Sequence, residues 1–277
     1  MANSVFTFWR EHNRAPYHFP MDEATWTLSR EADIDNEGRP LFSSLKSEVT
    51  RDRAGNITAL IEYGKTAFGF DASGEISSQV HYPVIRTLCF DETHTEDGRK
   101  LLQSALNAFC EEARVYAFFH YFGMSACARH GKLHESSPHV EKLLLDNSFL
   151  VEHENVYYAR TLTEQDAAPN RVSLNWKALS EGNCREFAAS QNGTEVGWGQ
   201  VHFLPQKDIA YLRWIYVDEK HQHQGLGTAI MGQLFAELYQ MGIRRFDTDT
   251  ALSNTVAQQY YEKTGFTNEG ITRSYYR

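Results

Sequence analysis

The segment Gln222-His223-Gln224-Gly225-Leu226-Gly227 separates a stretch typical of a β-strand from a stretch typical of an α-helix. Residues 210–217, directly before it, are dense in aromatic and β-branched side chains, which favours a strand. Residues 228–241, directly after it, repeat apolar side chains every three or four positions, as the buried face of a helix does. The sequence therefore predicts a strand, a glycine-containing loop and a helix, in that order.

This loop has the chemistry of an anion site. Gly225 and Gly227 have no Cβ, so backbone N–H groups beside them can approach phosphate oxygens closely. The N-terminus of the following helix adds about half a positive charge from the helix dipole. We therefore expect a pyrophosphate group to bind here without a cluster of arginines. The alternative is that the two glycines only form a tight turn.

The elements around the loop follow from other local patterns. Residues 184–190 and 196–204 are strand-like and flank Asn192-Gly193, a pair that strongly favours a hairpin turn. Gly242 ends the helix that follows the loop. A strand, a helix and a last strand are then expected at residues 244–250, 255–263 and 271–276. We expect an α/β (α+β) fold with a mixed sheet.

A second motif lies in the helix expected at residues 255–263. It reads Asn254-x-x-Ala257-x-x-x-Tyr261-Glu262-Lys263-x-Gly265-Phe266. The loop and this helix, at this distance, resemble the coenzyme A pyrophosphate loop and the downstream helix of the GNAT superfamily, the general-control-related N-acetyltransferases. The resemblance covers residues 171–277 and implies acetyl-coenzyme A (acetyl-CoA) as the co-substrate. No metal is expected, because His221 and His223 have no third ligand at the spacing of a zinc site.

The resemblance also implies which positions bind the cofactor. Backbone groups of Ile215 and Val217 are expected to pair with the pantetheine arm like an added strand, and Asn254 is expected to contact the cofactor farther along. The full expected set is Ile215, Tyr216, Val217, Gln222, His223, Gln224, Gly225, Leu226, Gly227, Thr228, Asn254 and Tyr261.

Tyr261 is the expected general acid. It matches the tyrosine that protonates the leaving thiolate in the family, and general acid catalysis is worth about 10² to 10⁴ in rate. The alternative is a core aromatic, because Tyr260 is adjacent and the helix needs an apolar face.

Acetyl transfer also requires a neutral amine. An alkylamine with a pKa of about 10.4 is mostly protonated at pH 7, so a base or a water relay is expected. Asp247 and Asp249 alternate along the strand before the second motif, which places them on one face of it. Either carboxylate is a candidate to receive the proton or to hold the ammonium group. The alternative is a pair of ordinary carboxylates at a strand end.

The N-terminal half contains an altered copy of the same pattern. A shift of 127 residues places Phe90-Asp91-Glu92 on Val217-Asp218-Glu219. A shift of 117 residues places residues 141–149 on residues 258–266, and both copies then end in a tyrosine-rich strand. The sequence therefore predicts an internal duplication.

The first copy departs from the pattern where the chemistry would take place. Lys100 replaces Gly227, and Leu144 stands at the position of Tyr261. Glu96 and Asp97 enter the loop, where two carboxylates would repel a pyrophosphate. The histidines of this copy are expected on loops: His120, His130, His134 and His139.

We therefore expect two tandem GNAT-like acyl-CoA N-acyltransferase folds. Residues 1–165 would form a degenerate, inactive domain and residues 166–277 the catalytic domain, with a linker near residues 163–170. The arrangement resembles tandem GNAT enzymes such as mycothiol synthase.

Composition and charge limit the class of protein. The net charge of −9 argues against a nucleic-acid partner and favours cationic partners. The sequence has no apolar run of about 18 residues, and its four cysteines are widely spaced without a CxxC pair. We expect a cytoplasmic monomer or homodimer that does not enter a membrane.

These patterns lead to one expected function and two alternatives. We expect an N-acetyltransferase that moves an acetyl group from acetyl-CoA to a primary amine of a small, cationic molecule. The first alternative is a protein N-acetyltransferase. The second is a non-catalytic protein that binds or senses acyl-CoA, and the presence of Tyr261 counts against it.

Overall fold

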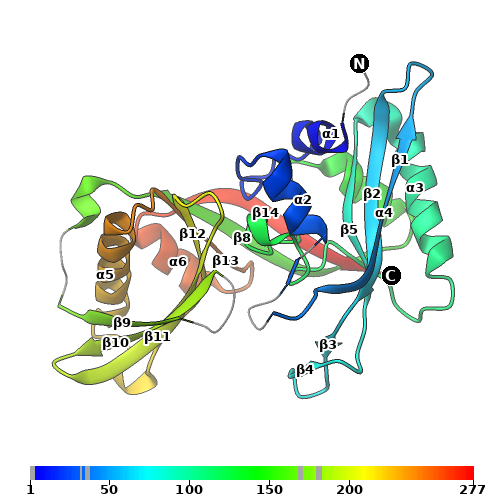
Figure 1. Ribbon diagram of the computed structural model, residues 1–277. Coiled ribbons are helices and arrows are strands. Elements are labelled where there is room, and N and C mark those ends of the chain that lie inside the picture. The colour runs from blue at the N-terminus through cyan, green and yellow to red at the C-terminus, as the bar shows by residue number, and fades with distance from the viewer. Residues whose placement is uncertain (1–3, 32, 35–37, 168–170, 179–182) are drawn as a thin grey trace. The chain divides into compact units, whose positions relative to one another are not determined.

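The chain folds into two compact units, each with a mixed sheet and packed helices (Figure 1). The structure is a computed structural model and describes residues 4–31, 33–34, 38–167, 171–178 and 183–277. The first unit is built from the N-terminal segment, residues 39–154 and residues 271–277, and the second from residues 155–270.

The second unit contains the glycine loop and the second motif. Its strands follow the order β10-β11-β12-β13-β8, with β9 at the outer edge beside β10. The elements are β8 (Leu150–Thr161), β9 (Ser173–Ala178), β10 (Cys184–Gln191), β11 (Thr194–Phe203), β12 (Ile209–Val217), α5 (Leu226–Gln240), β13 (Arg245–Ala251) and α6 (Thr255–Lys263). Among the described strands of this unit, β12 and β13 pair in parallel and the other pairs are antiparallel, so the sheet is mixed, as the sequence predicts.

Local sequence explains the boundaries of these elements. Asn192 and Gly193 have φ of 52° and 80°, the left-handed values that a tight hairpin turn requires between β10 and β11. Gly242 has φ of 93° and directly follows the C-cap of α5. The predicted helix at residues 255–263 is confirmed residue for residue. β9 was not predicted, and β14 (Thr267–Tyr276) begins four residues before its expected start.

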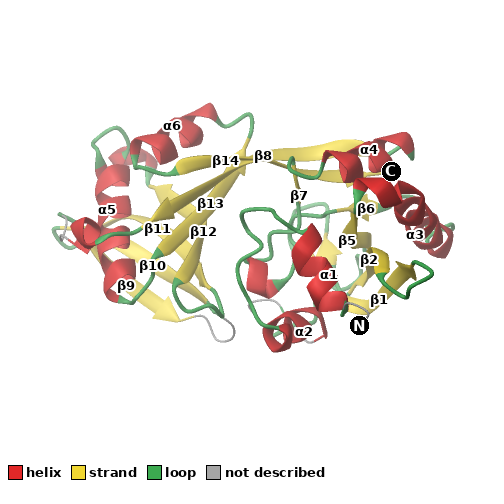
Figure 2. Cartoon of the chain, turned by 90° about the horizontal axis from the view of Figure 1, so that it is seen from above, coloured by secondary structure: helices red, strands yellow, loops and turns green. Residues whose placement is uncertain are grey.

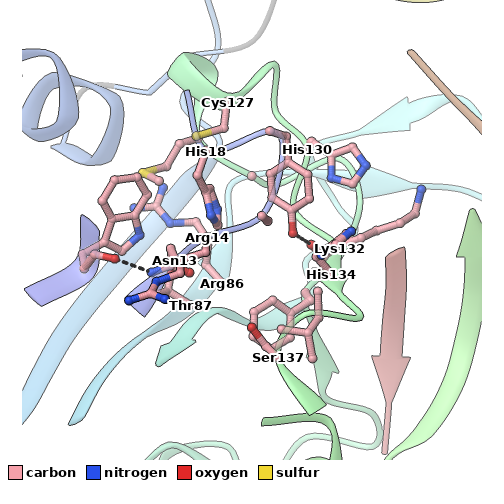
Figure 3. Close-up of a pocket in the computed structure, with 18 residues that line it drawn as sticks. Asn13, Arg14, His18, Arg86, Thr87, Cys127, His130, Lys132, His134 and Ser137 are labelled. Atoms are coloured by element: carbon pink, nitrogen blue, oxygen red, sulfur yellow. Dashed lines mark hydrogen bonds between the residues drawn. The ribbon is translucent and has the colours of Figure 1, made fainter. Parts of the chain in front are cut away.

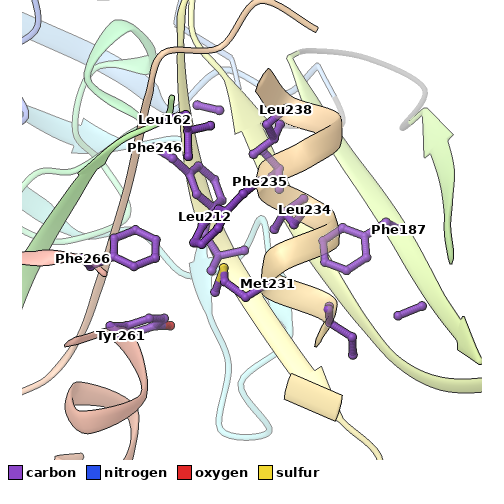
Figure 4. Packing of buried hydrophobic residues seen from close by; sticks show 14 of the residues in the cluster. Leu162, Phe187, Leu212, Met231, Leu234, Phe235, Leu238, Phe246, Tyr261 and Phe266 are labelled. Carbon is purple, nitrogen blue, oxygen red and sulfur yellow. The ribbon is translucent and has the colours of Figure 1, made fainter. Parts of the chain in front are cut away.

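The core of the second unit lies between its sheet and one layer of helices. α5 and α6 pack on the same face of the sheet (Figure 2). Leu234 and Phe235 of α5 meet Leu212 and Phe246 of the strands, with Tyr261 of α6 beside them (Figure 4). In the described part of the second unit, the chain forms no α-helix between β8 and β10. No α-helix from that segment therefore covers the opposite face of the sheet.

The first unit repeats this order with β1-β2-β5-β6-β14. Its elements are α1 (Val5–His12), α2 (Glu23–Glu31), β1 (Phe42–Arg51), β2 (Ile57–Thr66), β5 (Pro83–Phe90), α3 (Thr95–Ala108), β6 (Tyr116–Ala117), β7 (Leu133–His134) and α4 (Pro138–Asp146). The short strands β3 (Gly69–Phe70) and β4 (Ile76–Ser77) form a separate pair. α3 and α4 cover one face of the sheet, and α1 and α2 pack against the other.

The predicted duplication is confirmed element by element. α4 and α6 are offset by 117 residues at both ends. The short 3-10 helices at Glu92–His94 and Glu219–His221 are offset by 127 residues. The two copies therefore have one fold, at the spacing that the sequence indicates.

The last strand of each copy lies in the other unit. Residues 155–161 of β8, at the end of the first copy, pair with β13 of the second unit. Residues 271–277, at the end of the second copy, belong to the first unit, where β14 pairs with β6 and β7. The compact units are thus divided after residue 154, whereas the sequence placed the domain boundary at residues 165 and 166; the domain assignment itself stays a prediction.

Candidate active site

The parallel ladder between β12 and β13 ends before either strand does. Pairing runs from Ile209 with Arg245 to Leu212 with Thr248. β12 continues to Val217 and β13 to Ala251 without further pairing between them. The two strands therefore leave an open sheet edge beside the last residues of β12.

The backbone of β12 presents two residues to this open edge. Residues of an antiparallel ladder alternate between pairs that exchange both hydrogen bonds and pairs that exchange none. The N–H of Asp218 donates to the carbonyl oxygen of Val196 at 3.0 Å, and Tyr216 lies opposite Trp198, two pairs further along, with Val217 opposite Gly197 between them. By this alternation, the N–H and C=O groups of Ile215 and Val217 point away from β11. They are the two residues whose backbone, by the resemblance to the GNAT superfamily, is expected to pair with a pantetheine arm.

The glycine loop follows directly and ends at the first turn of α5. His223 and Gly225 have φ of 59° and 73°, and Gly225 is the N-cap residue of α5. The side-chain amide of Gln222 donates to the carbonyl oxygen of Val217 at 2.9 Å, which ties the loop to β12. Leu226 is buried in the core and anchors the end of the glycine loop that leads into α5. The first N–H groups of α5 have no acceptor within the helix, so they are available to an anion.

An arginine outside the predicted set of site residues lies beside this loop. The guanidinium of Arg171 donates to the carbonyl oxygen of Gln224 at 2.9 Å. A Cβ built on Gly225 would lie 3.1 Å from Nη2 of Arg171. Arg171 is exposed and brings a positive charge to the mouth of the loop. Its position directly after the expected linker was the only signal for it in the sequence.

The second motif positions α6 against the loop. The Asn254 side chain accepts a hydrogen bond from the N–H of Ala257 at 3.1 Å and so caps α6. The hydroxyl of Tyr260 donates to the carbonyl oxygen of Gly227 at 2.7 Å. Gly265 has φ of 87°, and a Cβ there would lie 1.8 Å from the guanidinium of Arg160. These motif residues therefore have structural roles in addition to any contact with a cofactor.

Tyr261 is buried in the core next to the open edge. Its ring packs against Tyr158 and Phe266, with centroids 5.6 and 5.5 Å away. Burial raises the pKa of the Tyr261 hydroxyl, the nearby Thr248 hydroxyl opposes this rise, and the charge of Asp249 adds to it. The hydroxyl therefore stays protonated at neutral pH, as a proton donor must. Both expected roles, core aromatic and general acid, fit this position.

The two candidate carboxylates have different surroundings. Asp247 is fully buried, accepts two hydrogen bonds of 2.9 Å from the guanidinium of Arg245, and accepts one of 2.8 Å from the Tyr157 hydroxyl. Asp249 is partly exposed and accepts hydrogen bonds from the Tyr211 hydroxyl and from the Asn155 amide. The geometry therefore favours Asp249 over Asp247 for contact with an acceptor.

Exposed aromatic side chains share the sheet face of Asp249. Trp198, Trp214 and Tyr216 are 43%, 62% and 42% exposed, and the rings of Trp198 and Tyr216 lie 6.4 Å apart. Ile215 and Val217, which alternate with these side chains along β12, pack against the core on the side of α5. The aromatic side chains therefore point to the opposite face. Asp249 alternates in the same way with the buried Thr248 and lies on that opposite face too.

A profile of the Acetyltransferase (GNAT) family matches residues 147–266, which include the open edge, the loop and α6. Over these residues, which are less than half of the chain, the protein is similar to the GNAT family. The [ribosomal protein bS18]-alanine N-acetyltransferase of Escherichia coli (strain K12) is 34% identical over 90 residues. The match covers 32% of this chain and 60% of that protein, so the chain spans about three fifths of the relative's length.

Two solved structures share the fold across most of the chain. A GCN5-related glucosamine N-acetyltransferase region of a fungal multi-domain GH3 β-N-acetylglucosaminidase has a TM-score of 0.64 and 11% identity, and the match covers 99% of this chain and 36% of that chain. A tandem GNAT protein from the clavulanic acid biosynthesis pathway has a TM-score of 0.57 and 12% identity, with coverage of 92% and 94%. At these identities the likeness shows the fold alone, which is two tandem GNAT-like folds.

The first GNAT-like copy has lost the glycine loop. α3 begins at Thr95, the position that matches Gln222, so the residues that form the loop in the second unit form a helical turn here. Asp97 lies in that turn and pairs with Lys100 at 3.0 Å. A helix start with acidic side chains repels an anion. This geometry supports the expectation that the first copy does not bind the cofactor.

None of the described helices is long and apolar enough to span a membrane. No group of three or more His, Cys, Asp or Glu side chains in the described ranges has the geometry of a metal site.

Proposed function

We propose that this chain is an N-acetyltransferase that uses acetyl-CoA and acetylates a primary amine of a small, cationic molecule. The open backbone of Ile215 and Val217, directly beside the loop of Gly225 and the N-terminus of α5, carries this proposal. The strand edge suits the amides of a pantetheine arm, and the loop suits a pyrophosphate. The residues present therefore fit acetyl-CoA.

The residues next to the open edge can donate and accept the protons that move in this reaction. Acetyl-CoA supplies an acetyl thioester, whose carbonyl carbon is attacked by the neutral amine as the C–S bond breaks. Tyr261 would donate its hydroxyl proton to the departing sulfur, because burial keeps that hydroxyl protonated. Asp249 would accept the proton released by the amine, directly or through water.

The exposed face around Asp249 supports a cationic acceptor. Trp198, Trp214 and Tyr216 offer ring faces to an ammonium group, and such contacts are worth about 0.5 to 1 kcal/mol each at exposed sites. A carboxylate on the same face adds a direct charge partner. A molecule with a second positive charge could therefore be held while its other amine reacts.

A protein acceptor is the second candidate. It is favoured by the relative from Escherichia coli, whose name gives an alanine of a ribosomal protein as its acceptor. An N-terminal amine also carries a positive charge that the face of Asp249 can bind. The two candidates differ in what surrounds the amine, so an acceptor panel separates them.

Thiol release from acetyl-CoA, read with a thiol-reactive dye, tests the proposal. The panel should contain alkyl diamines, matched monoamines, and peptides that begin with alanine. We expect the diamines to give the fastest turnover. Faster turnover of the peptides would contradict a small-molecule acceptor and favour a protein acceptor. Calorimetry on the same samples distinguishes the non-catalytic alternative, since a sensor would bind acetyl-CoA at one site per chain and release no thiol with any amine.

A further inference from the structure

The last strand of the first copy, β8, lies beside the candidate carboxylates of the second unit. Its end belongs to that unit and pairs with β13, with Tyr157 directly opposite Asp249. Alternate positions of a strand share a face, so Asn155 and Tyr157 lie on the same face of the sheet as Asp247 and Asp249. We call this face, which also carries the exposed aromatic side chains, the acceptor face. The degenerate copy therefore adds polar side chains to it.

Each carboxylate of β13 accepts a hydrogen bond from the residue of β8 that lies diagonal to it. The Tyr157 hydroxyl donates to Oδ2 of Asp247 at 2.8 Å, and the Asn155 amide donates to Oδ2 of Asp249. The two contacts differ in burial, because Asp247 is fully buried whereas Asn155 and Asp249 are both partly exposed. The contact between Asn155 and Asp249 is therefore within reach of an acceptor.

Asp249 receives a donor on each of its two oxygens. The Tyr211 hydroxyl donates to Oδ1, and the Asn155 amide donates to Oδ2. Burial, together with the charge of Asp249, raises the pKa of Tyr211 well above its usual value, so this hydroxyl is a donor at neutral pH. A carboxylate can accept about four hydrogen bonds, so these two donors fix its orientation and do not by themselves exclude an ammonium group.

The last strand of the second copy carries a different side chain at the matching position. Under the shift of 117 residues, Thr272 of β14 matches Asn155, and Tyr275 matches Tyr158. Tyr158 and Tyr275 both belong to the hydrophobic core of their unit, whereas Thr272 is fully buried on the other side of its strand. The two last strands therefore share the core tyrosine and differ at the residue that contacts Asp249 in the second unit.

The first unit is closed on the face that matches the acceptor face. Cys89, which matches Tyr216, lies in a buried cluster with residues of α1 and α2. Thr87, which matches Trp214, lines a small cavity (Figure 3). About 30 Å³ of this cavity is open to the centre of a water-sized sphere, which is room for a few waters and too small for a diamine. The exchange of last strands thus places Asn155 in the unit whose matching face is exposed.

We propose that Asn155 is a positioning residue of the acceptor site, and that its amide holds the Asp249 carboxylate in the orientation that binds the ammonium group of the acceptor. This inference rests on the proposed acetyl transfer and on the role proposed there for Asp249. The degenerate copy then contributes to the reaction through a side chain of its last strand, even though its own glycine loop is lost.

Calorimetric titration of the full chain with butane-1,4-diamine tests the inference, with coenzyme A present in place of acetyl-CoA so that no turnover occurs. Asn155→Leu keeps a similar side-chain volume and removes the amide. We expect its Kd for the diamine to rise about fivefold or more, because a hydrogen bond to a charged group is lost. Its Kd for coenzyme A should stay that of the wild type. In steady-state kinetics, KM for the diamine should rise by a similar factor, with a smaller change in kcat.

Asn147→Leu is the matched control. The Asn147 amide donates to the carbonyl oxygen of Leu143 at 2.8 Å at the end of α4 in the first unit. Its removal deletes a comparable hydrogen bond and should leave both dissociation constants unchanged. If Asn155→Leu does not fold, Asn155→Ala replaces it in every measurement.

A double-mutant cycle separates positioning from a general structural role. If Asn155 acts through Asp249, Asn155→Leu should weaken diamine binding in the wild-type background and have little further effect in Asp249→Asn. Equal factors in both backgrounds would overturn the inference. So would a wild-type Kd in the folded variant, or a wild type that does not bind the diamine. A wild type that binds the diamine and releases no thiol with any amine would contradict the proposed acetyl transfer alone, because the binding cycle does not require turnover.

Discussion

The hydroxyl of Tyr260 donates to the carbonyl oxygen of Gly227 at 2.7 Å, and this bond joins the two sequence motifs of the second unit. Gly227 lies in the first turn of α5, and Tyr260 lies in α6 beside Tyr261. Burial raises the pKa of Tyr260, so its hydroxyl remains a donor. The bond fixes the loop relative to the helix that carries the proposed general acid. We therefore propose different tasks for the adjacent tyrosines, with Tyr260 holding the loop and Tyr261 acting in the reaction.

Gly225→Ala should weaken acetyl-CoA binding more than its effect on folding explains. Gly225 has φ of 73° at the start of α5, where a Cβ is strained and points towards the guanidinium of Arg171. Gly193→Ala is the matched control, because Gly193 has φ of 80° with nothing within 4 Å of its Cβ position. Both variants should lose about 1 kcal/mol of stability.

Calorimetry with acetyl-CoA and thermal unfolding separate the two effects in these glycine variants. We expect one site per chain in the wild type, weaker binding in Gly225→Ala and unchanged binding in Gly193→Ala. Equal affinities in both variants would mean that the loop glycine serves only to make a turn.

Arg171→Gln should weaken acetyl-CoA binding by a modest, salt-dependent factor. Its exposed guanidinium stands beside the loop, and exposed charge pairs are worth about 0.2 to 1 kcal/mol, or up to about fivefold in Kd. Lys177→Gln removes an equal charge from an exposed position on β9 and serves as the control. Measuring Kd at two salt concentrations checks this, and equal values for both variants would remove Arg171 from the site.

Local patterns were sufficient to predict the order of strands and helices in each copy. They did not predict which unit contains the last strand of each copy. The Asn192-Gly193 turn and the apolar face of α5 are local signals, and both were confirmed. The exchange of β8 and β14 between the units depends on pairing between distant segments, which no local pattern encodes.

The contacts of the side chains in the site could not be predicted from the sequence either. Asp247 and Asp249 are indistinguishable by spacing, yet the structure gives Asp247 a bidentate contact with Arg245. Arg171 was missed because its contact with Gln224 depends on how β9 and the preceding chain approach the loop. Of the histidines expected on loops, His120 and His130 lie in turns or loops, but His134 lies in β7 and His139 in α4.

Asp249→Asn should impair use of the acceptor and spare the cofactor. Asp249 is partly exposed on the face of the aromatic residues, so it can contact an ammonium group. We expect a higher KM for the amine or a lower kcat, with an unchanged Kd for acetyl-CoA. Steady-state kinetics with the best amine of the panel measure this. Wild-type kinetics in Asp249→Asn would exclude the residue from the mechanism.

Asp247→Asn should change stability and its dependence on pH. Burial raises the pKa of Asp247 from 3.8 to about 6, although Arg245 and Tyr157 oppose this rise. Because the folded state then holds the proton more tightly than the unfolded state, the free energy of unfolding falls as pH rises from 3.8 to about 6. The variant lacks this component of the fall. Denaturant unfolding across this pH range checks it, and parallel curves for wild type and variant would contradict the assignment.

Tyr261→Phe should lower turnover strongly while the protein stays folded. Phenylalanine keeps the ring that packs against Tyr158 and Phe266, and removes only the hydroxyl. The Thr248 hydroxyl keeps its own acceptor, since it donates to the carbonyl oxygen of Leu212 at 3.1 Å. If the Tyr261 hydroxyl protonates the departing sulfur, kcat and kcat/KM should fall together by about 10² or more, with little change in cofactor affinity.

Tyr260→Phe provides the matched control for Tyr261→Phe. It removes a hydroxyl from the adjacent residue, but that hydroxyl holds the loop at Gly227 and does not face Thr248. We therefore expect Tyr260→Phe to weaken acetyl-CoA binding and to leave kcat at saturating cofactor near the wild-type value. The opposite pattern would exchange the roles of the two tyrosines. A stable Tyr261→Phe that turns over at the wild-type rate would assign the proton to water and leave Tyr261 as a core aromatic, the alternative that its burial among Tyr158 and Phe266 allows.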